Sequence, residues 1–381
     1  MTITSGRFVV VGGSVAASTA VQVLRAEGFD GDITLVSDEA LAPYSRVPLS
    51  KGVLAGREKH EALGGLPAAG VDVRLSSPAI HLDLVGSVVA TSQESIPFDR
   101  LLIATGARAR RIGTAAQTES VFRDVGDVTA LKERLESASS VLIVGGGVLG
   151  MELASTCRGL GLAVTVVDMI PPMSKLLGRS MAVRVVAAAE VLGVRTVVSP
   201  GGVQLLGRPV PWGVQCADGQ TLRADVVVSA VGDLPNVEWL ADSGLALGGG
   251  VHVDSRCQAA DRVFAAGDVA AVKDPSSTAA YRLPTFTNAV EQGRIAALGM
   301  LHGRDAPPHE PSRYMWTEQF DLDIKMAGAA GPIGEPAVVE GDLDQMVALL
   351  AWPDGGSATT LMSVNYRVPV ARLKRGVAAI G

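Results

Sequence analysis

Val141–Gly150 read VLIVGGGVLG, an apolar run that ends in closely spaced glycines. Gly145, Gly147 and Gly150 fit the pattern G-x-G-x-x-G, which joins a strand to a helix where a dinucleotide binds. The first glycine makes the turn, the second lets the backbone approach a phosphate, and the third lets the helix pack closely on the strand. The helix N-terminus attracts phosphate through unpaired N–H groups and a positive partial charge. The stretch therefore predicts a β-α-β unit with a dinucleotide at its first turn.

The residues after this turn complete the predicted unit. Residues 148–160 have helical spacing, residues 164–167 form a second apolar run, and Asp168 ends that run. An acidic residue at this place binds ribose hydroxyls and repels a 2′-phosphate. We therefore predict that the three glycines and Asp168 bind NADH in preference to NADPH, a preference that the nearby Lys175 and Arg179 weaken.

A second, altered copy of the turn lies near the N-terminus. Val9–Ser18 read VVVGGSVAAS, in which Gly12 keeps the turn position while Ser14 and Ala17 replace the second and third glycines. Both substitutes are small, and the Ser14 hydroxyl can donate a hydrogen bond to phosphate. This stretch alone leaves two interpretations open: a second dinucleotide site, and a packing turn that binds nothing.

Two further features favour a second dinucleotide. Asp38 or Glu39, after the next apolar run, is placed for an adenosine ribose. Val263–Asp268 read VFAAGD, an apolar run that ends in Gly267 and Asp268. FAD is longer than NAD and needs a further hydrogen-bonding group from another strand, which Asp268 can provide; an exposed turn aspartate is the alternative. We predict that the first turn holds FAD and the second NADH, because a retained flavin and an exchangeable nicotinamide need separate sites.

The same succession of apolar runs and helical stretches occurs twice. Strands are predicted at residues 7–12, 33–36 and 100–104, and again at 141–144, 164–167 and 226–230, after a crossing between domains at 107–120. Short runs predict a small antiparallel sheet at 71–75, 80–82 and 88–90, and a meander at 194–198, 213–217 and 221–222. Runs at 337–340, 346–351 and 359–364, followed by a basic helical tail, predict an α+β module. The predicted fold class is α/β, with two doubly wound units.

Composition and cysteine usage exclude several other classes. The 381 residues carry a formal net charge of −6 and are 48% hydrophobic, which favours a globular protein and argues against nucleic acid as a partner. No apolar segment reaches the roughly 18 residues of a membrane span, so we expect a cytoplasmic protein without membrane insertion. Cys157, Cys216 and Cys257 form no CxxC pair and the five histidines are scattered. We therefore predict neither a dithiol site between sequence neighbours nor a metal site.

Short motifs between residue 7 and about residue 375 carry a more specific resemblance. Besides the two turns and Glu152, they are PYSRVPLSK at 43–51, ATG at 104–106, FR at 122–123, AVG at 230–232, PN at 235–236, AGD at 266–268, NAVEQ at 288–292 and WTEQ at 316–319. Together they make the chain resemble the FAD-dependent ferredoxin reductases that serve oxygenases. The resemblance implies a glutathione-reductase-like fold with two Rossmann-like domains: an FAD-binding domain at 1–112 and 233–310, an NAD-binding domain at 113–232, and a C-terminal α+β domain at 311–381.

The resemblance also implies roles for individual residues. Lys51 would lie beside the flavin ring, Arg123 and Asp268 would contact FAD, Trp316 would sit at the isoalloxazine, and Glu152 would lie near the nicotinamide and could pair with Lys51. A lysine there can stabilise reduced flavin and an aromatic ring can shield it; an ordinary surface lysine and a core tryptophan are the alternatives. Lys51, Glu152 and Trp316 are thus the candidate catalytic residues. Further cofactor contacts are implied at Arg46, Ala79, Thr105, Gly106, Gly232, Gly267 and Phe286.

The activity implied is electron transfer from NADH through FAD to a [2Fe–2S] ferredoxin that serves an oxygenase or a cytochrome P450. Three alternatives stay open: an NADH oxidase or other NADH-dependent flavin reductase, a disulfide or CoA-disulfide reductase of the same fold, and a partner protein that binds FAD and NADH with incidental turnover. The disulfide reductase would need a cysteine earlier than Cys157. Family members often have an acidic residue where this chain has Pro284, which leaves the exact acceptor open. A monomer and a homodimer are both compatible with the sequence.

Overall fold

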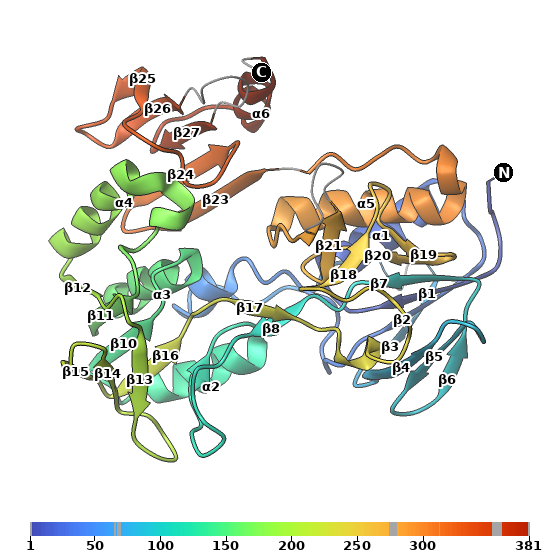
Figure 1. The fold of residues 1–381 in the computed structure, drawn as a ribbon, viewed down its shortest axis with the longest axis horizontal. Helices are drawn as coiled ribbons and strands as arrows, with labels where there is room; N and C mark the ends of the chain where they lie inside the picture. The colour runs from blue at the N-terminus through green and yellow to red at the C-terminus, as the bar shows by residue number, and fades with distance from the viewer. Residues whose placement is uncertain are drawn as a thin grey trace. The chain divides into compact units, whose positions relative to one another are not determined.

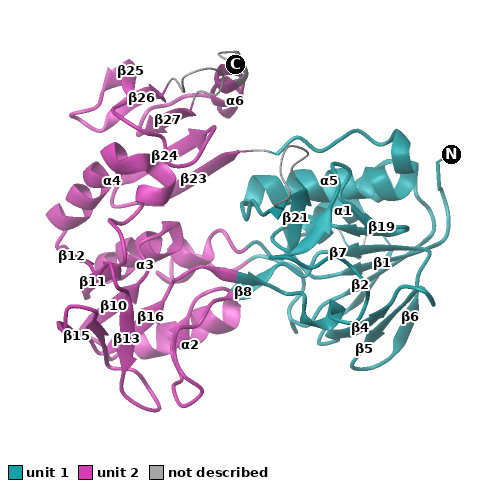
Figure 2. Ribbon diagram, viewed as in Figure 1, with its two compact units in different colours: residues 1–45, 61–108, 234–312 teal, residues 46–60, 109–233, 313–381 magenta. Residues whose placement is uncertain are grey.

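The computed structural model describes residues 2–64, 66, 70–273, 280–311, 313–352 and 360–379. The chain divides into two compact units (Figures 1 and 2): unit 1 is residues 1–45, 61–108 and 234–312, and unit 2 is residues 46–60, 109–233 and 313–381. The chain passes between the units within β8 (Ala107–Ala109) and again within β17 (Asp233–Pro235). The three domains implied by the resemblance, with boundaries at 112, 232 and 310, stay a prediction.

Unit 1 is built on a six-stranded sheet in the order β19-β20-β7-β1-β2-β3, in which every neighbouring pair except β19–β20 is parallel. Its strands are β1 (Arg7–Val11), β2 (Asp32–Val36), β3 (Val71–Arg74), β7 (Arg100–Ile103), β19 (Gln258–Ala260) and β20 (Val263–Ala265). Phe8 and Val10 of β1 face one apolar cluster, and Val9 and Val11 face another. Since both faces are covered, β1 is a continuous apolar run rather than an alternating one.

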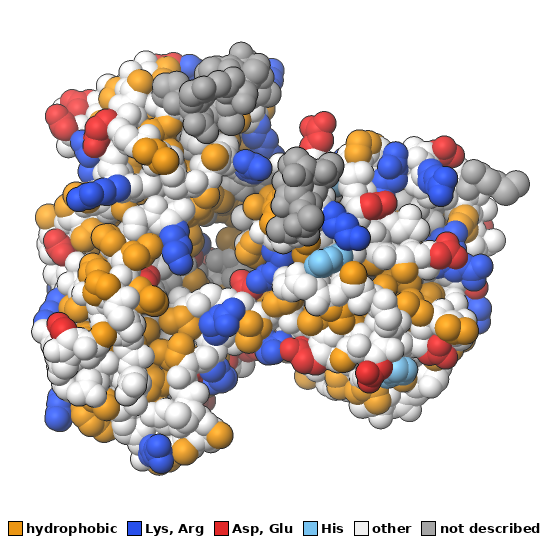
Figure 3. Space-filling view, viewed as in Figure 1, with side chains coloured by type: hydrophobic (Ala, Val, Ile, Leu, Met, Phe, Trp, Pro, Cys, Tyr) orange, Lys and Arg blue, Asp and Glu red, His pale blue; other side chains and the backbone are white. Residues whose placement is uncertain are grey.

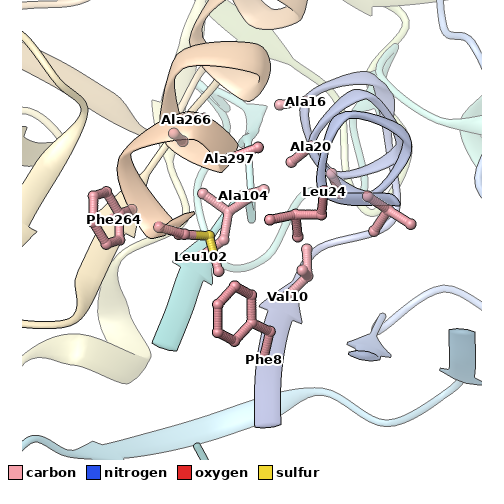
Figure 4. Close-up of a cluster of buried hydrophobic side chains, with 14 of the residues drawn as sticks. Phe8, Val10, Ala16, Ala20, Leu24, Leu102, Ala104, Phe264, Ala266 and Ala297 are labelled. Carbon is pink, nitrogen blue, oxygen red and sulfur yellow. The ribbon is translucent and has the colours of Figure 1, made fainter. Parts of the chain in front are cut away.

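Helices α1 (Val15–Ala26) and α5 (Phe286–His302) cover one face of this sheet. Figure 4 shows small side chains such as Ala16 and Ala20 of α1 and Ala297 of α5 gathered above the sheet. A Cβ atom on Gly293 of α5 would lie 2.4 Å from the carbonyl oxygen of Ala16. This close approach joins the last helix of unit 1 to its first and so unites segments far apart in sequence.

Small sheets cover the other face of the unit 1 sheet. They are β4 (Ala79–Asp83), β5 (Val88–Thr91) and β6 (Ser95–Pro97), and β18 (Val251–Val253), β21 (Ala270–Lys273) and β22 (Ala280–Tyr281), with a 3₁₀ turn at η2 (Glu238–Leu240). A second 3₁₀ turn, η3 (Gly303–Asp305), directly follows α5. The predicted antiparallel sheet is correct for β4 and β5 but wrong for residues 71–75, because β3 pairs in parallel with β2. As an edge strand, β3 is only partly buried, so its sequence lacks the continuous apolar run of a central strand.

Unit 2 contains a five-stranded parallel sheet in the order β12-β11-β10-β16-β9. Its strands are β9 (Ser120–Val121), β10 (Ser140–Val144), β11 (Ala163–Asp168), β12 (Val194–Val198) and β16 (Val226–Ser229), with helices α2 (Val125–Leu135), α3 (Val148–Gly159) and α4 (Ser174–Val191). The antiparallel meander is β13 (Val203–Leu206), β14 (Gly213–Cys216) and β15 (Thr221–Arg223). Placing residues 194–198 in the meander was wrong: they form β12, another half-exposed edge strand beside β11.

The two units repeat one construction. In each, three parallel strands in reversed order are followed by a meander and a fourth parallel strand, β3-β2-β1-β7 in unit 1 and β12-β11-β10-β16 in unit 2. The fifth parallel strand differs in origin, because β20 follows the shared strands in the chain whereas β9 precedes them. The predicted α/β fold class with two doubly wound units is confirmed.

The C-terminal part of unit 2 is a five-stranded antiparallel sheet with one helix. The sheet order is β23-β24-β27-β26-β25, with β23 (Tyr314–Gln319), β24 (Leu322–Ala327), β25 (Ala337–Asp342), β26 (Val347–Trp352) and β27 (Thr360–Val364), followed by α6 (Val370–Ala379). The predicted runs match β25, β26 and β27, although Thr359 lies outside the described residues; β23 and β24 were not predicted.

The surface and the helices show two further properties. Side chains of both charge signs are interspersed with apolar ones over the face drawn in Figure 3. Within the described ranges, every helix is too short or too polar to cross a bilayer.

The third glycine of the second turn generates a prediction about stability. A Cβ atom on Gly150 would lie 1.9 Å from the carbonyl oxygen of Gly145, whereas one on Gly159, in the same helix, would meet no described atom within 4 Å. We expect Gly150→Ala to lower the free energy of unfolding by about 3 kcal/mol or more, since backbone atoms cannot yield as side chains do. Gly159→Ala is the matched control and should be neutral or stabilising by up to about 1 kcal/mol. Urea unfolding followed by circular dichroism checks both; equal midpoints would contradict the steric argument.

Asp225 ties the beginnings of β10 and β16 together. Its Oδ2 accepts hydrogen bonds from the Ser139 N–H (2.9 Å) and hydroxyl (2.8 Å) and from the Ser140 N–H and hydroxyl, both at 2.9 Å. The Ser139 side chain contributes most, and these donors together lower the pKa of Asp225 from 3.8 to about 2. The ionised form is therefore preferred in the folded state.

This depressed pKa gives stability that depends on pH. Because the folded pKa lies below the unfolded value, the contribution is complete above about pH 4 and disappears as the pH falls through 2. Asp225→Asn should therefore lower the urea midpoint at pH 6, and the gap between variant and wild type should narrow at pH 3. A gap that is the same at both pH values would show that the carboxylate charge has no part in the contact.

Candidate functional site

The first glycine turn leaves the beginning of α1 open to an anion. Gly12 has φ +123° and a Cβ there would lie 2.1 Å from the Ala104 carbonyl oxygen, so only glycine fits. Ser14 is the N-cap residue, but its side chain does not cap the helix; instead its hydroxyl lies 3.5 Å from the Tyr44 carbonyl oxygen. No acidic side chain occupies the first turn of α1. Ala17, the third small residue, is fully buried. This turn fits a bound diphosphate.

The two candidate acids after β2 differ in their surroundings. Glu39 is half-buried and its Oε2 accepts a hydrogen bond from the Tyr44 hydroxyl at 2.5 Å, whereas Asp38 is exposed. Tyr44 thus orients Glu39, which makes Glu39 the better ordered of the two candidate ribose ligands. Another predicted cofactor contact, Ala79, is the partly buried first residue of β4.

The loops after β7 and β20 are held by specific hydrogen bonds. The Thr105 hydroxyl donates to the Asn236 carbonyl at 2.9 Å, and Asn236 Nδ2 donates back to the Thr105 carbonyl at 2.9 Å. Gly106 has φ +63° and Gly267 has φ +81°, which favour glycine. The Asp268 carbonyl accepts a bond from Arg282 at 2.9 Å. These bonds fix the loop backbones.

Buried polar atoms near Gly267 fit a polar ligand. The Gly267 N–H donates to Gln292 Oε1 at 2.9 Å. Gln292 Nε2 and Asn288 Oδ1 are buried without a hydrogen-bond partner among the described residues. Buried polar groups usually have partners, so a bound molecule here would satisfy them. The NAVEQ motif contains both residues, but sequence analysis predicted no role for either.

Phe286, a predicted cofactor contact, lies at the start of α5 and is 37% exposed.

The second turn repeats the first in unit 2. Gly145 has φ +105° and its Cβ would lie 2.3 Å from the Ala230 carbonyl oxygen. A Cβ on Gly147 would meet no described atom within 4 Å. The protein itself therefore does not require glycine at 147, and the open space suits a phosphate that approaches the backbone. Asp168 lies at this turn, with Oδ2 accepting from the Gly146 N–H and Oδ1 from the Met169 N–H, both at 2.6 Å.

The remaining predicted contacts are divided between the units. Unit 1 holds Gly12, Ser14, Ala17, Asp38, Glu39, Ala79, Thr105, Gly106, Gly267, Asp268 and Phe286, and unit 2 holds Arg46, Lys51, Arg123, Gly145, Gly147, Gly150, Glu152, Asp168, Gly232 and Trp316. Gly232 has φ +99°, and its carbonyl accepts from the Arg110 N–H at 3.0 Å. Arg46 and Arg123 are half-buried. Their contacts with a cofactor stay predictions.

The structure brings Lys51 and Glu152 together. Lys51 lies in a π-helical turn, η1 (Leu49–Val53), and its φ of −117° and ψ of −105° break the regular helix. Such turns are frequent at functional sites. The Lys51 Nζ lies 2.9 Å from Glu152 Oε1, and the Glu152 residue is only 6% exposed. The structure thus pairs a buried carboxylate with a close ammonium.

Two hydroxyls complete the surroundings of Glu152. The Ser50 hydroxyl donates to Glu152 Oε2 at 2.6 Å, and the Thr317 hydroxyl donates to Oε1 at 2.7 Å. Sequence reasoning missed both contacts: Ser50 adjoins Lys51 and Thr317 lies in the WTEQ motif, but nothing in a linear sequence brings them to one carboxylate. Trp316 is half-buried and its ring stacks on Tyr314 at 6.1 Å between centroids. Its predicted role at the flavin stays a prediction.

Comparisons with known proteins agree with this geometry. The family model for the pyridine nucleotide-disulphide oxidoreductases matches residues 6–293. The ferredoxin–NAD(+) reductase component of the biphenyl dioxygenase system of Paraburkholderia xenovorans (strain LB400) is 36% identical, over 95% of this chain and 91% of the relative. Rhodocoxin reductase of Rhodococcus erythropolis is 33% identical, over 89% of this chain and 82% of the relative.

A solved structure shows the same similarity in three dimensions. The crystal structure of the covalent putidaredoxin reductase–putidaredoxin complex matches with a TM-score of 0.87 and 25% identity, over 98% of this chain and 93% of the other. With paired glycine turns, a family model that covers most of the chain and relatives above 30% identity, the chain belongs to the pyridine nucleotide-disulphide oxidoreductase family.

Proposed function

We propose that this flavoprotein oxidoreductase passes electrons from NADH through FAD to a [2Fe–2S] ferredoxin that serves an oxygenase or a cytochrome P450. The observation that carries the proposal is the repeated turn: one chain holds two helix N-termini shaped for a diphosphate, each with an acidic residue after the next strand. The relatives named as ferredoxin–NAD(+) reductase and rhodocoxin reductase support an iron–sulfur protein as acceptor.

In this proposal, the residues of each unit hold one dinucleotide. In unit 1, the Gly12 turn and Glu39 bind the diphosphate and the adenosine ribose of FAD. In unit 2, Gly145, Gly147 and Asp168 bind NADH, and the Asp168 carboxylate disfavours the extra phosphate of NADPH. When bound, FAD supplies the step from hydride transfer to single-electron transfer. The protein positions the two cofactors, and in this proposal the Lys51 ammonium is its principal charge beside the flavin ring.

The cysteines argue against the disulfide reductase alternative. Cys157, Cys216 and Cys257 are all buried and unbonded. Burial raises the pKa of the Cys157 thiol to about 12 and raises that of Cys257 above its usual range. Since the thiolate is the reactive form, Cys157 and Cys257 are poor nucleophiles at neutral pH. A redox reaction of this protein therefore proceeds without a protein dithiol.

Thiol chemistry gives a direct check. We expect a thiol reagent such as dithionitrobenzoate to leave the native holoprotein unmodified and to titrate three thiols after denaturation. Cys157→Ala should retain the wild-type rate of NADH-dependent flavin reduction within about twofold, because the thiol takes no part in the reaction. Cys257→Ala serves as a control for the effect of removing a buried thiol. Fast modification of a thiol in the native protein, with loss of activity, would favour the disulfide reductase interpretation.

Spectroscopy of the purified protein tests the proposed function. The protein should be yellow, stoichiometric NADH should bleach it under anaerobic conditions, and NADPH should act at least about tenfold more slowly because Asp168 repels the 2′-phosphate. Reduction of cytochrome c should then depend on added [2Fe–2S] ferredoxin. A colourless protein that cannot be reconstituted with FAD would refute the proposal. Rapid oxygen consumption without ferredoxin would favour an NADH oxidase, and a long-lived NADH complex with slow turnover would favour a binding protein.

A further inference from the structure

We propose that Thr317 and Ser50 are positioning residues, whose hydroxyls hold the Glu152 carboxylate in place for the Lys51 ammonium. The inference deepens the proposed function and rests on it, because it takes Lys51 to lie beside the flavin ring. It assigns to the C-terminal sheet, which carries Thr317, a part in tuning the reaction.

The burial of Glu152 makes these hydroxyls necessary. The residue is 6% exposed and Thr317 is fully buried, so the carboxylate depends mainly on protein groups for its hydrogen bonds. A carboxylate in such a place is stabilised by an opposite charge and by hydrogen bonds to both oxygens. Lys51 Nζ and the Thr317 hydroxyl contact Oε1 at 2.9 and 2.7 Å, and the Ser50 hydroxyl contacts Oε2 at 2.6 Å. Both oxygens are therefore satisfied.

Neighbouring contacts support the Thr317 hydroxyl and the turn that carries Ser50. Gln319 Nε2 donates to Thr317 Oγ1 at 3.3 Å. Because the threonine oxygen accepts from this amide, its own proton is directed to Glu152. On the other side, the Thr156 hydroxyl donates to the Ser50 carbonyl at 2.7 Å and fixes the π-helical turn to α3. Donors from two separate segments, η1 and β23, thus converge on a carboxylate carried by α3.

The arrangement lets Lys51 respond to charge beside it. Thr317 and Lys51 share Oε1, while Ser50 holds Oε2. If the Lys51 ammonium turns toward negative charge developing on the cofactor side, both carboxylate oxygens keep a hydroxyl partner. The movement then leaves no buried oxygen of this carboxylate without a hydrogen bond, which lowers its energetic cost.

The test compares Thr317→Val with a matched control. Thr317→Val keeps the shape of the side chain but removes the hydroxyl. Using the FAD-loaded full-length protein, we expect the stopped-flow rate constant for anaerobic reduction by NADH to fall about tenfold, in line with loss of one hydrogen bond to a charged group, and Thr317→Ser to restore it. The control is Thr360→Val in β27 of the same sheet, which removes a hydrogen bond of 2.9 Å from the Thr360 hydroxyl to the Ala329 carbonyl and should leave the rate unchanged.

A double-mutant cycle separates positioning from general stability. In a Lys51→Met background, Thr317→Val should have no further effect on the rate or on the reduction potential of the bound flavin, both of which Thr317→Val alone should lower, because the hydroxyl acts through the ammonium. Additive losses would mean a merely structural role and would overturn the inference. If Thr317→Val does not fold or retain FAD, Ser50→Ala takes its place in the same cycle.

The behaviour of the wild-type protein with NADH distinguishes failure of this inference from failure of the proposed function on which it rests. A wild-type protein that binds FAD but is not reduced by NADH would refute the proposed function itself. A wild-type protein that is reduced, with Thr317→Val as fast as Thr360→Val, would refute only the positioning role.

Discussion

A single steric constraint underlies both nucleotide-binding halves: the turn residue after the first strand lies against the carbonyl oxygen of the neighbouring strand. A side chain at Gly12 would meet the Ala104 carbonyl at 2.1 Å, and one at Gly145 would meet the Ala230 carbonyl at 2.3 Å. The backbone must therefore turn sharply, and the following helix starts directly above the end of the sheet. Its free N–H groups are thereby placed for a phosphate, and in unit 2 the acid after the next strand, Asp168, accepts a hydrogen bond from the Gly146 N–H of the turn.

Beyond that contact, the two copies differ in where the backbones approach most closely. In unit 2 the third glycine is required, because a Cβ on Gly150 would collide with the Gly145 carbonyl. In unit 1 Ala17 occupies that position and is fully buried, while the closest approach moves to Gly293, which lies against Ala16. Glycine thus marks the site of backbone contact, and the departure from the sequence pattern at Ala17 reflects a different packing partner for the first helix.

The ion pair between the half-buried Lys51 and the buried Glu152 is the second organising interaction of unit 2. Its carboxylate receives donors from the π-helical turn and from the C-terminal sheet, so a module with its own antiparallel core is tied to a nucleotide-binding helix through one charged group. Removing one partner from a buried ion pair is usually far more disruptive than removing an exposed one. The chemistry proposed for this protein therefore depends on charge placed by the fold, and its three cysteines are buried away from it.

Much of this organisation follows from local sequence. The apolar runs around Val10 and Leu142 and the glycines after them identify the central strands, both turns and the helices that follow, because these features depend on residues close together in the chain. The half-exposed edge strands β3 and β12 were assigned to the wrong sheets, since an edge strand carries the mixed pattern of an antiparallel one. Only the tertiary structure decided that Ser50, Thr317 and Lys51 meet at Glu152, because contacts across more than 100 residues leave no periodic trace in the sequence.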